Sequence, residues 1–327
     1  MKRVILTSSS GLCLIPANRA DVVVSLIFRF VWGPLPSQDH LAGHLASRSP
    51  YLETHWSQFI RGSSRVSRLR KNRALVHFCE NFDVVELWFD RNPNDQLQLI
   101  WILEYLRSDP ATASRLRLCL PDIDLAGSDS QGLCTRAVRD VDVTEDELET
   151  ASMAWEAYRA PTPEACFYLS GRKLSALPLL SPTLSELLAE LPSSTTGLGA
   201  TEMRFLKLIA SGCTRTRRLF ELRGPADVHV FDQWESEALL EELAFGPMPA
   251  VAGLDEELAT LTPDHARHRY AAYRRSRLAL TEFGKAVLAG REDFRRHNPI
   301  KRWWGGTLLT NERLWRWDAQ SGSLVAP

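Results

Sequence analysis

The sequence predicts an α/β protein with an N-terminal, mostly parallel sheet flanked by helices, and a helical C-terminal region with a winged-helix-like part. Two observations support this fold class. In the first third of the chain, short apolar runs alternate with helix-like segments, which is the pattern of parallel strands with covering helices. These runs are mostly apolar, as in strands that are buried on both faces.

The strand-like runs are short. They are Val4–Leu6, Val22–Phe28, Val84–Phe89 and Leu116–Leu120. A stretch rich in turn-forming residues follows the last run, from Pro121 to Gly132, and indicates a connection. We therefore predict an α/β domain over residues 1–122, a helical connecting region over residues 123–196 and a winged-helix-like C-terminal domain over residues 197–327.

Helix-start signals follow this connection. Thr144 and Glu147 have the spacing of a capping box, which predicts a helix to about Tyr158. A second start is predicted at Ser181-Pro182, with proline at the first helical position. An amphipathic segment with a glycine stop spans Thr201–Gly212. These signals make the middle of the chain helical.

The C-terminal region contains a further predicted helix at about Val230–Ala244 and then a strand, a threonine cap and a helix in succession over Leu278–Gly290. This succession is similar to the strand and last helix of winged-helix modules. Two tryptophan-rich segments near the end, Trp303–Gly306 and Trp315–Asp318, resemble a tightly packed hairpin.

Composition excludes several classes of protein. With 327 residues, 44% hydrophobic and 24% charged, the chain can build two cores. Its net charge of −1 gives no general field that would attract a polyanion. No apolar run reaches the roughly 20 residues of a membrane span, and the first residues lack a secretory h-region. Six scattered cysteines form no zinc-ligand pattern. We predict a soluble cytoplasmic protein without a metal or cofactor.

The segment after the third strand-like run is the main candidate site. Asn92, Pro93 and Asp95 are explained by helix capping alone, since they suit the N-cap, first and third helical positions. Ligands of parallel sheets bind beyond the carboxyl ends of the strands, which makes Asp90, Arg91, Asp95 and Gln96 candidate ligand-binding residues. Both the structural and the functional interpretation remain open at this point.

Two other turns are predicted to meet this segment at the same edge of the sheet. Ser8, Ser9 and Ser10 follow the first strand, and Trp32 follows the second. A serine turn could present N–H groups to an anion, although a plain turn is the alternative. The chain lacks the glycine motifs of dinucleotide-binding and phosphate-loop proteins. No nucleophile motif supports a particular reaction.

Basic residues gather in the C-terminal region, where they alternate with aromatic residues. This combination is typical of nucleic-acid binding, although a structural role is the alternative. The candidate nucleic-acid-binding residues are Arg274, Arg275, Arg277, Arg295 and Arg296. An earlier basic run over residues 61–73 could contact phosphate or form a solvated face.

Short motifs also occur in the order found in one bacterial family. They are Gly33–Pro36, Leu87–Phe89, Asp95–Leu99, Ala154–Pro161, Leu177–Leu180 and Gly197–Glu202. In these motifs the chain resembles the family catalogued as domain of unknown function 1835, over most of its length up to about residue 245. The resemblance implies an α/β N-terminal domain joined to a helical C-terminal part, and it implies no reaction.

The chain departs from the family pattern at the three turns that we expect to converge. Family members tend to have Gly-Asp in place of Ser8-Ser9, His-Glu in place of Val31-Trp32, and Glu-His in place of Asp90-Arg91. If those groups carry out catalysis or bind a metal in the family, this divergent member has lost or changed that activity.

Three functional hypotheses follow. The first is a ligand-sensing or regulatory binding protein, whose strand-end pocket takes a small polar or phosphorylated ligand and whose winged-helix-like module contacts nucleic acid or a partner protein. The second is a hydrolase or transferase with an acidic strand-end site. The third is a protein-interaction scaffold with paired acidic and basic faces. The sequence alone does not decide whether the protein is an enzyme.

Overall fold

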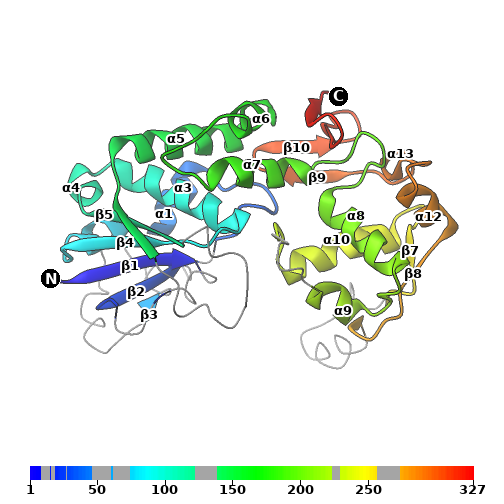
Figure 1. Ribbon diagram of the computed structural model, residues 1–327, viewed down its shortest axis with the longest axis horizontal. Helices are drawn as coiled ribbons and strands as arrows, with labels where there is room; N and C mark the ends of the chain where they lie inside the picture. The colour runs from blue at the N-terminus through cyan, green and yellow to red at the C-terminus, as the bar shows by residue number, and fades with distance from the viewer. Residues whose placement is uncertain are drawn as a thin grey trace. The chain divides into compact units, whose positions relative to one another are not determined.

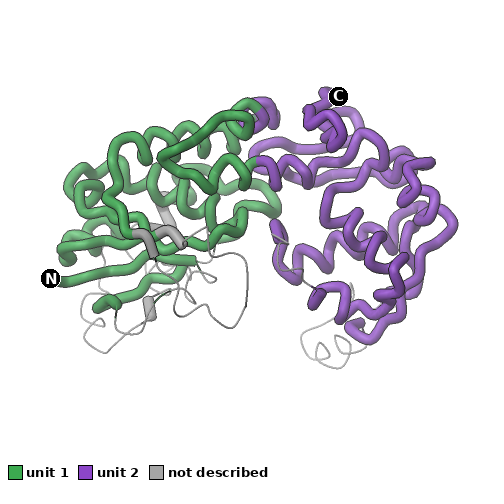
Figure 2. Tube along the Cα trace, viewed as in Figure 1, with its two compact units in different colours: residues 1–160, 168–184 green, residues 161–167, 185–327 purple. Residues whose placement is uncertain are grey.

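The computed structural model describes residues 1–8, 15, 19–26, 28–45, 60–61, 74–121, 138–222, 229–255 and 273–327. These residues form two compact units, which Figure 2 colours separately. Unit 1 comprises residues 1–160 and 168–184, and unit 2 comprises residues 161–167 and 185–327. The described range therefore covers most of each unit.

The core of unit 1 is a sheet whose described strands have the order β3-β2-β1-β4-β5-β6 (Figure 1). The strands are β1 (Arg3–Ser8), β2 (Val22–Leu26), β3 (Ile60–Arg61), β4 (Val84–Trp88), β5 (Leu116–Pro121) and β6 (Val138–Asp142). The four central strands run parallel, while β3 and β6 are antiparallel at the two edges. The predicted mostly parallel sheet with flanking helices is confirmed.

Strand β6 is the clearest element that the sequence analysis did not predict. Its residues mix two valines with three charged side chains, and Asp142 is exposed. This pattern suits an edge strand with one solvated face, and such a strand has no continuous apolar run.

Helices of unit 1 cover the sheet in two layers. They are α1 (Gln38–Leu45), α2 (Leu75–Cys79), α3 (Pro93–Arg107), α4 (Pro110–Ala113) and α5 (Glu145–Arg159). In Figure 1, α5 lies on the side of α3 that faces away from the sheet. Aromatic rings join the layers, because the Phe30 ring lies 5.4 Å from that of Trp101 and 5.0 Å from that of Trp155. Their burial contributes about 2–3 kcal/mol per ring to stability.

Both helix starts predicted in the middle of the chain exist. The capping box of α5 forms as predicted, with the Thr144 N–H donating to Glu147 Oε2 at 2.7 Å. Helix α7 (Leu180–Ala189) begins one residue before Ser181, so Pro182 is its third residue, where a missing N–H still costs nothing. Helix α6 (Glu164–Ser170) precedes it. That residues 123–196 form a separate connecting region stays a prediction.

Unit 2 contains helices followed by short strand pairs. Its elements are α8 (Ala200–Ala210), α9 (Thr216–Glu221), α10 (Gln233–Phe245), β7 (Val251–Ala252), β8 (Ala279–Leu280), α12 (Glu282–Leu288), α13 (Phe294–His297), β9 (Lys301–Trp304), β10 (Thr307–Thr310), β11 (Arg316–Asp318) and β12 (Ser323–Val325). The tryptophan-rich end forms two antiparallel pairs, β9 with β10 and β11 with β12. Trp304 is buried, and its Nε1 donates to Leu187 O at 2.7 Å.

The predicted strand, threonine cap and helix near residue 280 are all present. Strand β8 pairs with β7, and Thr281 Oγ1 caps α12 by accepting from the Gly284 N–H at 2.9 Å. A Cβ at Gly284 would lie 2.0 Å from Ala250 O, so only glycine lets α12 pack this closely. Arg215 forms an isolated antiparallel bridge with Arg277 just before β8. The chain segments around β8 therefore form a small antiparallel sheet beside α8, α9 and α10.

Among the described helices, none combines the length and apolar character that crossing a bilayer requires.

Candidate functional site

The strand-end segment predicted as a site lies at a special point of the sheet. Strand β1 pairs with β2 on one side and with β4 on the other, so the chain reverses its winding direction between β1 and β4. The crevice beyond the carboxyl ends of such a strand pair is where open α/β sheets bind ligands. Ser8 ends β1 and Asp90 follows β4, which puts both of these predicted residues at this edge.

Asp95 joins these two strand ends. Ser8 Oγ donates a short hydrogen bond to Asp95 Oδ2, and the Asp90 N–H donates to the same oxygen at 3.1 Å. Both Ser8 and Asp95 are only 1% exposed. The Asp95 carboxylate therefore links the end of β1 to the turn after β4. These hydrogen bonds support the structural interpretation of Asp95.

The turn after β2 is tied to the same helix. Asn94 accepts from the Phe30 N–H at 2.8 Å and donates to Phe28 O at 2.9 Å. Trp32 lies two residues further along this turn and is half-buried. The three turns thus converge on the first turn of α3, as the sequence analysis expected. Ser9 and Ser10 lie outside the described residues.

The remaining predicted residues differ in whether a ligand could reach their side chains. Asn92 caps α3 by accepting from the Asp95 N–H at 3.0 Å, as predicted. Gln96 is buried and donates to Asp90 O at 2.7 Å. Asp90 is half-buried and Arg91 is exposed. Of the predicted set, Asp90 and Arg91 are the charged side chains that a ligand at this edge could reach.

Replacing Ser8 with alanine tests the structural role of the Ser8–Asp95 bond. The buried Asp95 carboxylate would lose a donor, so we expect Ser8→Ala to lower the free energy of unfolding by about 1–2 kcal/mol. Ser114→Ala serves as the control, because Ser114 is exposed and donates only to Ala111 O. Urea denaturation measures both variants. Equal stabilities of the two variants would contradict this role.

A second buried carboxylate in the sheet was not singled out from the sequence. Glu86 in β4 is fully buried and forms ion pairs with Arg3 at 2.5 Å and with Arg19 at 3.0 Å. Trp88 Nε1 donates to its other oxygen at 2.8 Å. A lone glutamate inside the apolar run Val84–Trp88 was the available signal. Its partners satisfy the charge, and this gives Glu86 a structural role.

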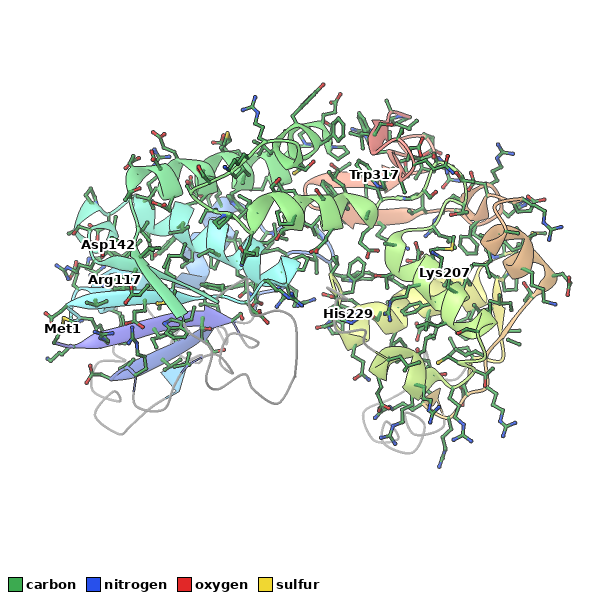
Figure 3. The ribbon with its side chains drawn as sticks, viewed as in Figure 1. Met1, Arg117, Asp142, Lys207, His229 and Trp317 are labelled. Carbon is green, nitrogen blue, oxygen red and sulfur yellow. The ribbon has the colours of Figure 1, made fainter. Side chains whose placement is uncertain are left out.

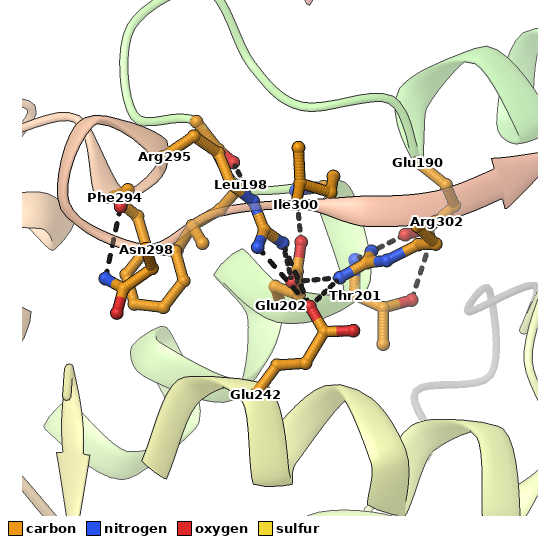
Figure 4. Close-up of polar contacts among 12 residues, drawn as sticks. Glu190, Leu198, Thr201, Glu202, Glu242, Phe294, Arg295, Asn298, Ile300 and Arg302 are labelled. Carbon is orange, nitrogen blue, oxygen red and sulfur yellow. Dashed lines mark hydrogen bonds and ion pairs between the residues drawn. The ribbon is translucent and has the colours of Figure 1, made fainter. Parts of the chain in front are cut away.

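Unit 2 also contains a buried ion-pair network, drawn in Figure 4. Glu202, at the third position of α8, pairs with Arg295 at 2.7 Å and with Arg302 at 2.8 Å. Glu242 of α10 pairs with Arg302 at 2.6 Å. Burial alone would raise the pKa of Glu202, but the charges of Arg302 and Arg295 outweigh burial and hold it at about 2. Because Arg295 is only 3% exposed, it does not face nucleic acid as the sequence analysis expected.

Glu190 lies beside the start of α8, and its pKa is shifted in the opposite direction to that of Glu202. It accepts from the backbone N–H and the hydroxyl of Thr201, at 3.1 and 2.6 Å. Burial nevertheless raises the pKa of Glu190 to about 7. Between about pH 4.5 and pH 7 the folded state therefore holds a proton that the unfolded state has lost, so stability from this group falls as pH rises through this window.

We expect Glu190→Gln to remove this pH dependence. The amide cannot ionise, so the variant should gain stability relative to the wild type between pH 5 and pH 8. Glu312→Gln is the control, because Glu312 is exposed and hydrogen bonds lower its pKa. Denaturation midpoints at both pH values provide the measurement. A constant difference between Glu190→Gln and the wild type would contradict the expected effect.

Arginines, all exposed except the half-buried Arg274, gather where the segment between α8 and α9 meets the residues before β8. Arg215 and Arg277 are bridge partners, and the Arg217 N–H donates to Arg274 O at 3.1 Å. We call this set the arginine surface. Its members are Arg215, Arg217, Arg218, Arg274, Arg275 and Arg277.

Glu221 is an acidic residue that pairs with the arginine surface. Its carboxylate lies 2.7 Å from Arg217 and 3.1 Å from Arg274. Among the described ion pairs of this surface, the arginines therefore outnumber the carboxylates. Three of the arginines were predicted from the basic C-terminal run. The run Thr214–Arg218, which supplies the other three, was the signal that sequence reasoning missed.

Arg296, the last predicted candidate, lies elsewhere, on α13. Its side chain is 78% exposed, and its Nε is 3.9 Å from Asp293 Oδ2. No hydrogen bond links it to the arginine surface among the bonds of the described residues. Arg296 is therefore an exposed cation beside Asp293 and not a member of the arginine surface.

Comparison with protein-family models and with curated proteins gives no match for this chain.

The resemblance to the domain of unknown function 1835 family therefore stays a prediction. Within the described part of the chain, no cluster of three or more histidine, cysteine, aspartate or glutamate side chains has the geometry to hold a metal ion. Among the described features, the arginine surface has the clearest binding chemistry. Guanidinium groups bind phosphate oxygens through two parallel hydrogen bonds.

Proposed function

We propose that this protein is a binding protein whose second unit is a winged-helix-like module that binds the phosphate backbone of nucleic acid. The observation that carries this proposal is the arginine surface, in which a backbone bridge brings Arg215 and Arg277 together. Lysine and arginine neutralise phosphates and release condensed counterions, which makes such binding strong at low salt.

The order of elements in unit 2 supports the winged-helix part of the proposal. Helix α8 is followed by a bridging residue, by α9 and α10, and then by the antiparallel pair of β7 and β8. Arg274, Arg275 and Arg277 come shortly before β8 and would contribute phosphate contacts.

Helix α10 indicates which kind of contact is made. It precedes the strand pair, where the recognition helix of a winged-helix module would be, yet it carries Glu237, Glu241 and Glu242. Carboxylates repel phosphate oxygens and accept hydrogen bonds from few base edges. We therefore propose that binding uses the arginine surface and depends little on base sequence.

The strand-end edge of unit 1 supports a second role, the recognition of a small polar or phosphorylated ligand. The winding reversal between β1 and β4 puts Asp90 and Arg91 where such sheets bind ligands. An acidic hydrolase or transferase site has less support, because Asp95 is buried and bonded to Ser8. Unchanged activity of Asp90→Asn and Arg91→Ala in a broad substrate screen would remove the enzyme alternative.

Binding of a labelled 20-base DNA duplex and of a single-stranded RNA at 50 and 200 mM salt tests the proposed function. We expect measurable binding at the lower salt concentration and a loss of at least about tenfold at the higher one. Absence of binding to either nucleic acid at 50 mM salt would rule out the proposal.

A further inference from the structure

A surface pocket of about 610 Å³ lies in unit 2, where the chain turns from α8 into α9. Its volume is within the range of pockets that hold small molecules. Gly212 makes the turn with φ +96°, in the left-handed region that favours glycine. The Cys213 N–H donates back to Leu208 O at 2.9 Å. The end of α8 therefore holds this side of the pocket in a defined backbone conformation.

Two arginines, Arg215 and Arg218, line the pocket, and both are exposed. Arg215 directly precedes α9, and Arg218 lies three residues further along the same helix. The backbone holds Arg215 in place, because it forms an antiparallel bridge with Arg277. Figure 3 shows nitrogen-bearing side chains projecting from α9 and its neighbouring segment, below the labelled Lys207. The pocket therefore presents two guanidinium groups to a ligand.

The described lining of the pocket has an excess of positive charge, because it includes both arginines and no carboxylate. Within the described part of the chain, neither arginine side chain takes part in an ion pair. Glu221 pairs instead with Arg217 and Arg274, and it does not line the pocket. Burial raises the pKa of the Cys213 thiol, which also lines the pocket, so the thiol adds no negative charge at neutral pH.

We infer that this pocket binds a phosphomonoester, with the dianionic phosphate between Arg215 and Arg218. A guanidinium binds phosphate oxygens through parallel hydrogen bonds. A phosphomonoester carries a charge of about −1.5 to −2 at pH 7, which two guanidinium groups match, whereas an internal phosphodiester of a strand carries one charge. The exposed Thr214 contributes a hydroxyl, and the exposed Leu222 gives apolar surface to the group that carries the phosphate.

The inference deepens the proposed function, because it rests on the assignment of phosphate binding to the arginine surface and adds a ligand class. The terminal phosphate of a strand and the phosphate of a free sugar phosphate present the same chemistry to the two arginines. Both are phosphomonoesters, and both are distinct from the internal phosphates of a duplex.

Calorimetric titration of the full chain with ribose 5-phosphate and with its methyl ester tests the inference at pH 7.5. The methyl ester is the corresponding phosphodiester, so the two ligands differ in one charge and one methyl group. We expect the monoester to bind at least about fivefold more tightly, because the second negative charge is matched in the pocket. Equal affinities for the two ligands, or no binding of the monoester at millimolar concentration, would overturn the inference.

Arg218→Gln should lower the affinity for ribose 5-phosphate about tenfold, because one charged partner of the phosphate is lost. Arg275→Gln is the matched control, since Arg275 is an exposed member of the arginine surface that does not line the pocket. It should weaken strand binding and leave the affinity for ribose 5-phosphate unchanged. Unchanged monoester binding by Arg218→Gln, or an equal loss in both variants, would contradict the assignment to this pocket.

A short single-stranded DNA of about eight bases, with either a 5′-phosphate or a 5′-hydroxyl, identifies the source of the phosphate. Tighter binding of the phosphorylated strand that Arg218→Gln abolishes would assign the pocket to strand ends. Equal binding of the two strands, with retained binding of ribose 5-phosphate, would assign it to free phosphomonoesters.

Duplex binding at 50 mM salt separates this inference from the proposed function. Duplex binding by a protein that does not distinguish the monoester from its methyl ester would remove the inference and leave the proposed function. Monoester binding without duplex binding would remove the proposed function and leave the pocket as a phosphomonoester site.

Discussion

Glu202→Gln is expected to lower the free energy of unfolding by about 3–5 kcal/mol at pH 7, because it breaks a buried ion pair from one side. Arg295 is 3% exposed and would remain charged next to a neutral amide. The carboxylate also accepts from the Gly199 N–H at 2.8 Å, so the start of α8 would lose part of its cap. Urea denaturation of the variant and the wild type measures the effect.

A control substitution and the pH dependence of stability test whether the loss comes from the buried ion-pair network. Glu282→Gln removes a carboxylate of an exposed pair with Lys285 and should change stability little. Because the pKa of Glu202 is held at about 2, its contribution is present above the unfolded value near pH 4.5 and is lost as pH falls toward 2. Equal effects of both substitutions at pH 7 would contradict the structural role of the network.

Much of unit 1 could be predicted from the sequence because its signals are local. The apolar runs of β1, β2, β4 and β5 and the cap at Asn92 depend on neighbouring residues. The convergence of three turns also followed from parallel strands alone. The Ser8–Asp95 bond could not be predicted, because 87 residues separate its partners and only the tertiary structure brings them together.

The arginine surface and the network of unit 2 illustrate the same limit. Arg274, Arg275 and Arg277 were predicted as a basic run, but their pairing with the segment around Arg215 depends on a strand bridge. Arg295 had the same sequence context as Arg296, yet one is buried and the other exposed. The buried partner Glu202, 93 positions away along the chain, decides the difference.

Reversing two charges of the arginine surface should weaken nucleic-acid binding strongly. We expect Arg215→Glu/Arg277→Glu to lower affinity for a 20-base duplex at 50 mM salt by at least about tenfold and to reduce the salt slope by about 2, because two phosphate contacts are lost. Arg313→Glu is the single-charge control, since Arg313 is exposed and lies in the turn after β10. Far-ultraviolet circular dichroism verifies that the variants fold.

The most direct test of the arginine surface is the salt dependence of duplex binding, measured side by side for the wild type, Arg215→Glu/Arg277→Glu and Arg313→Glu. We expect parallel salt slopes for the wild type and Arg313→Glu, and a shallower slope with weaker binding for the double variant, for two duplexes of unrelated sequence alike. Identical slopes and affinities for the wild type and the double variant would contradict the assignment of phosphate binding to Arg215 and Arg277.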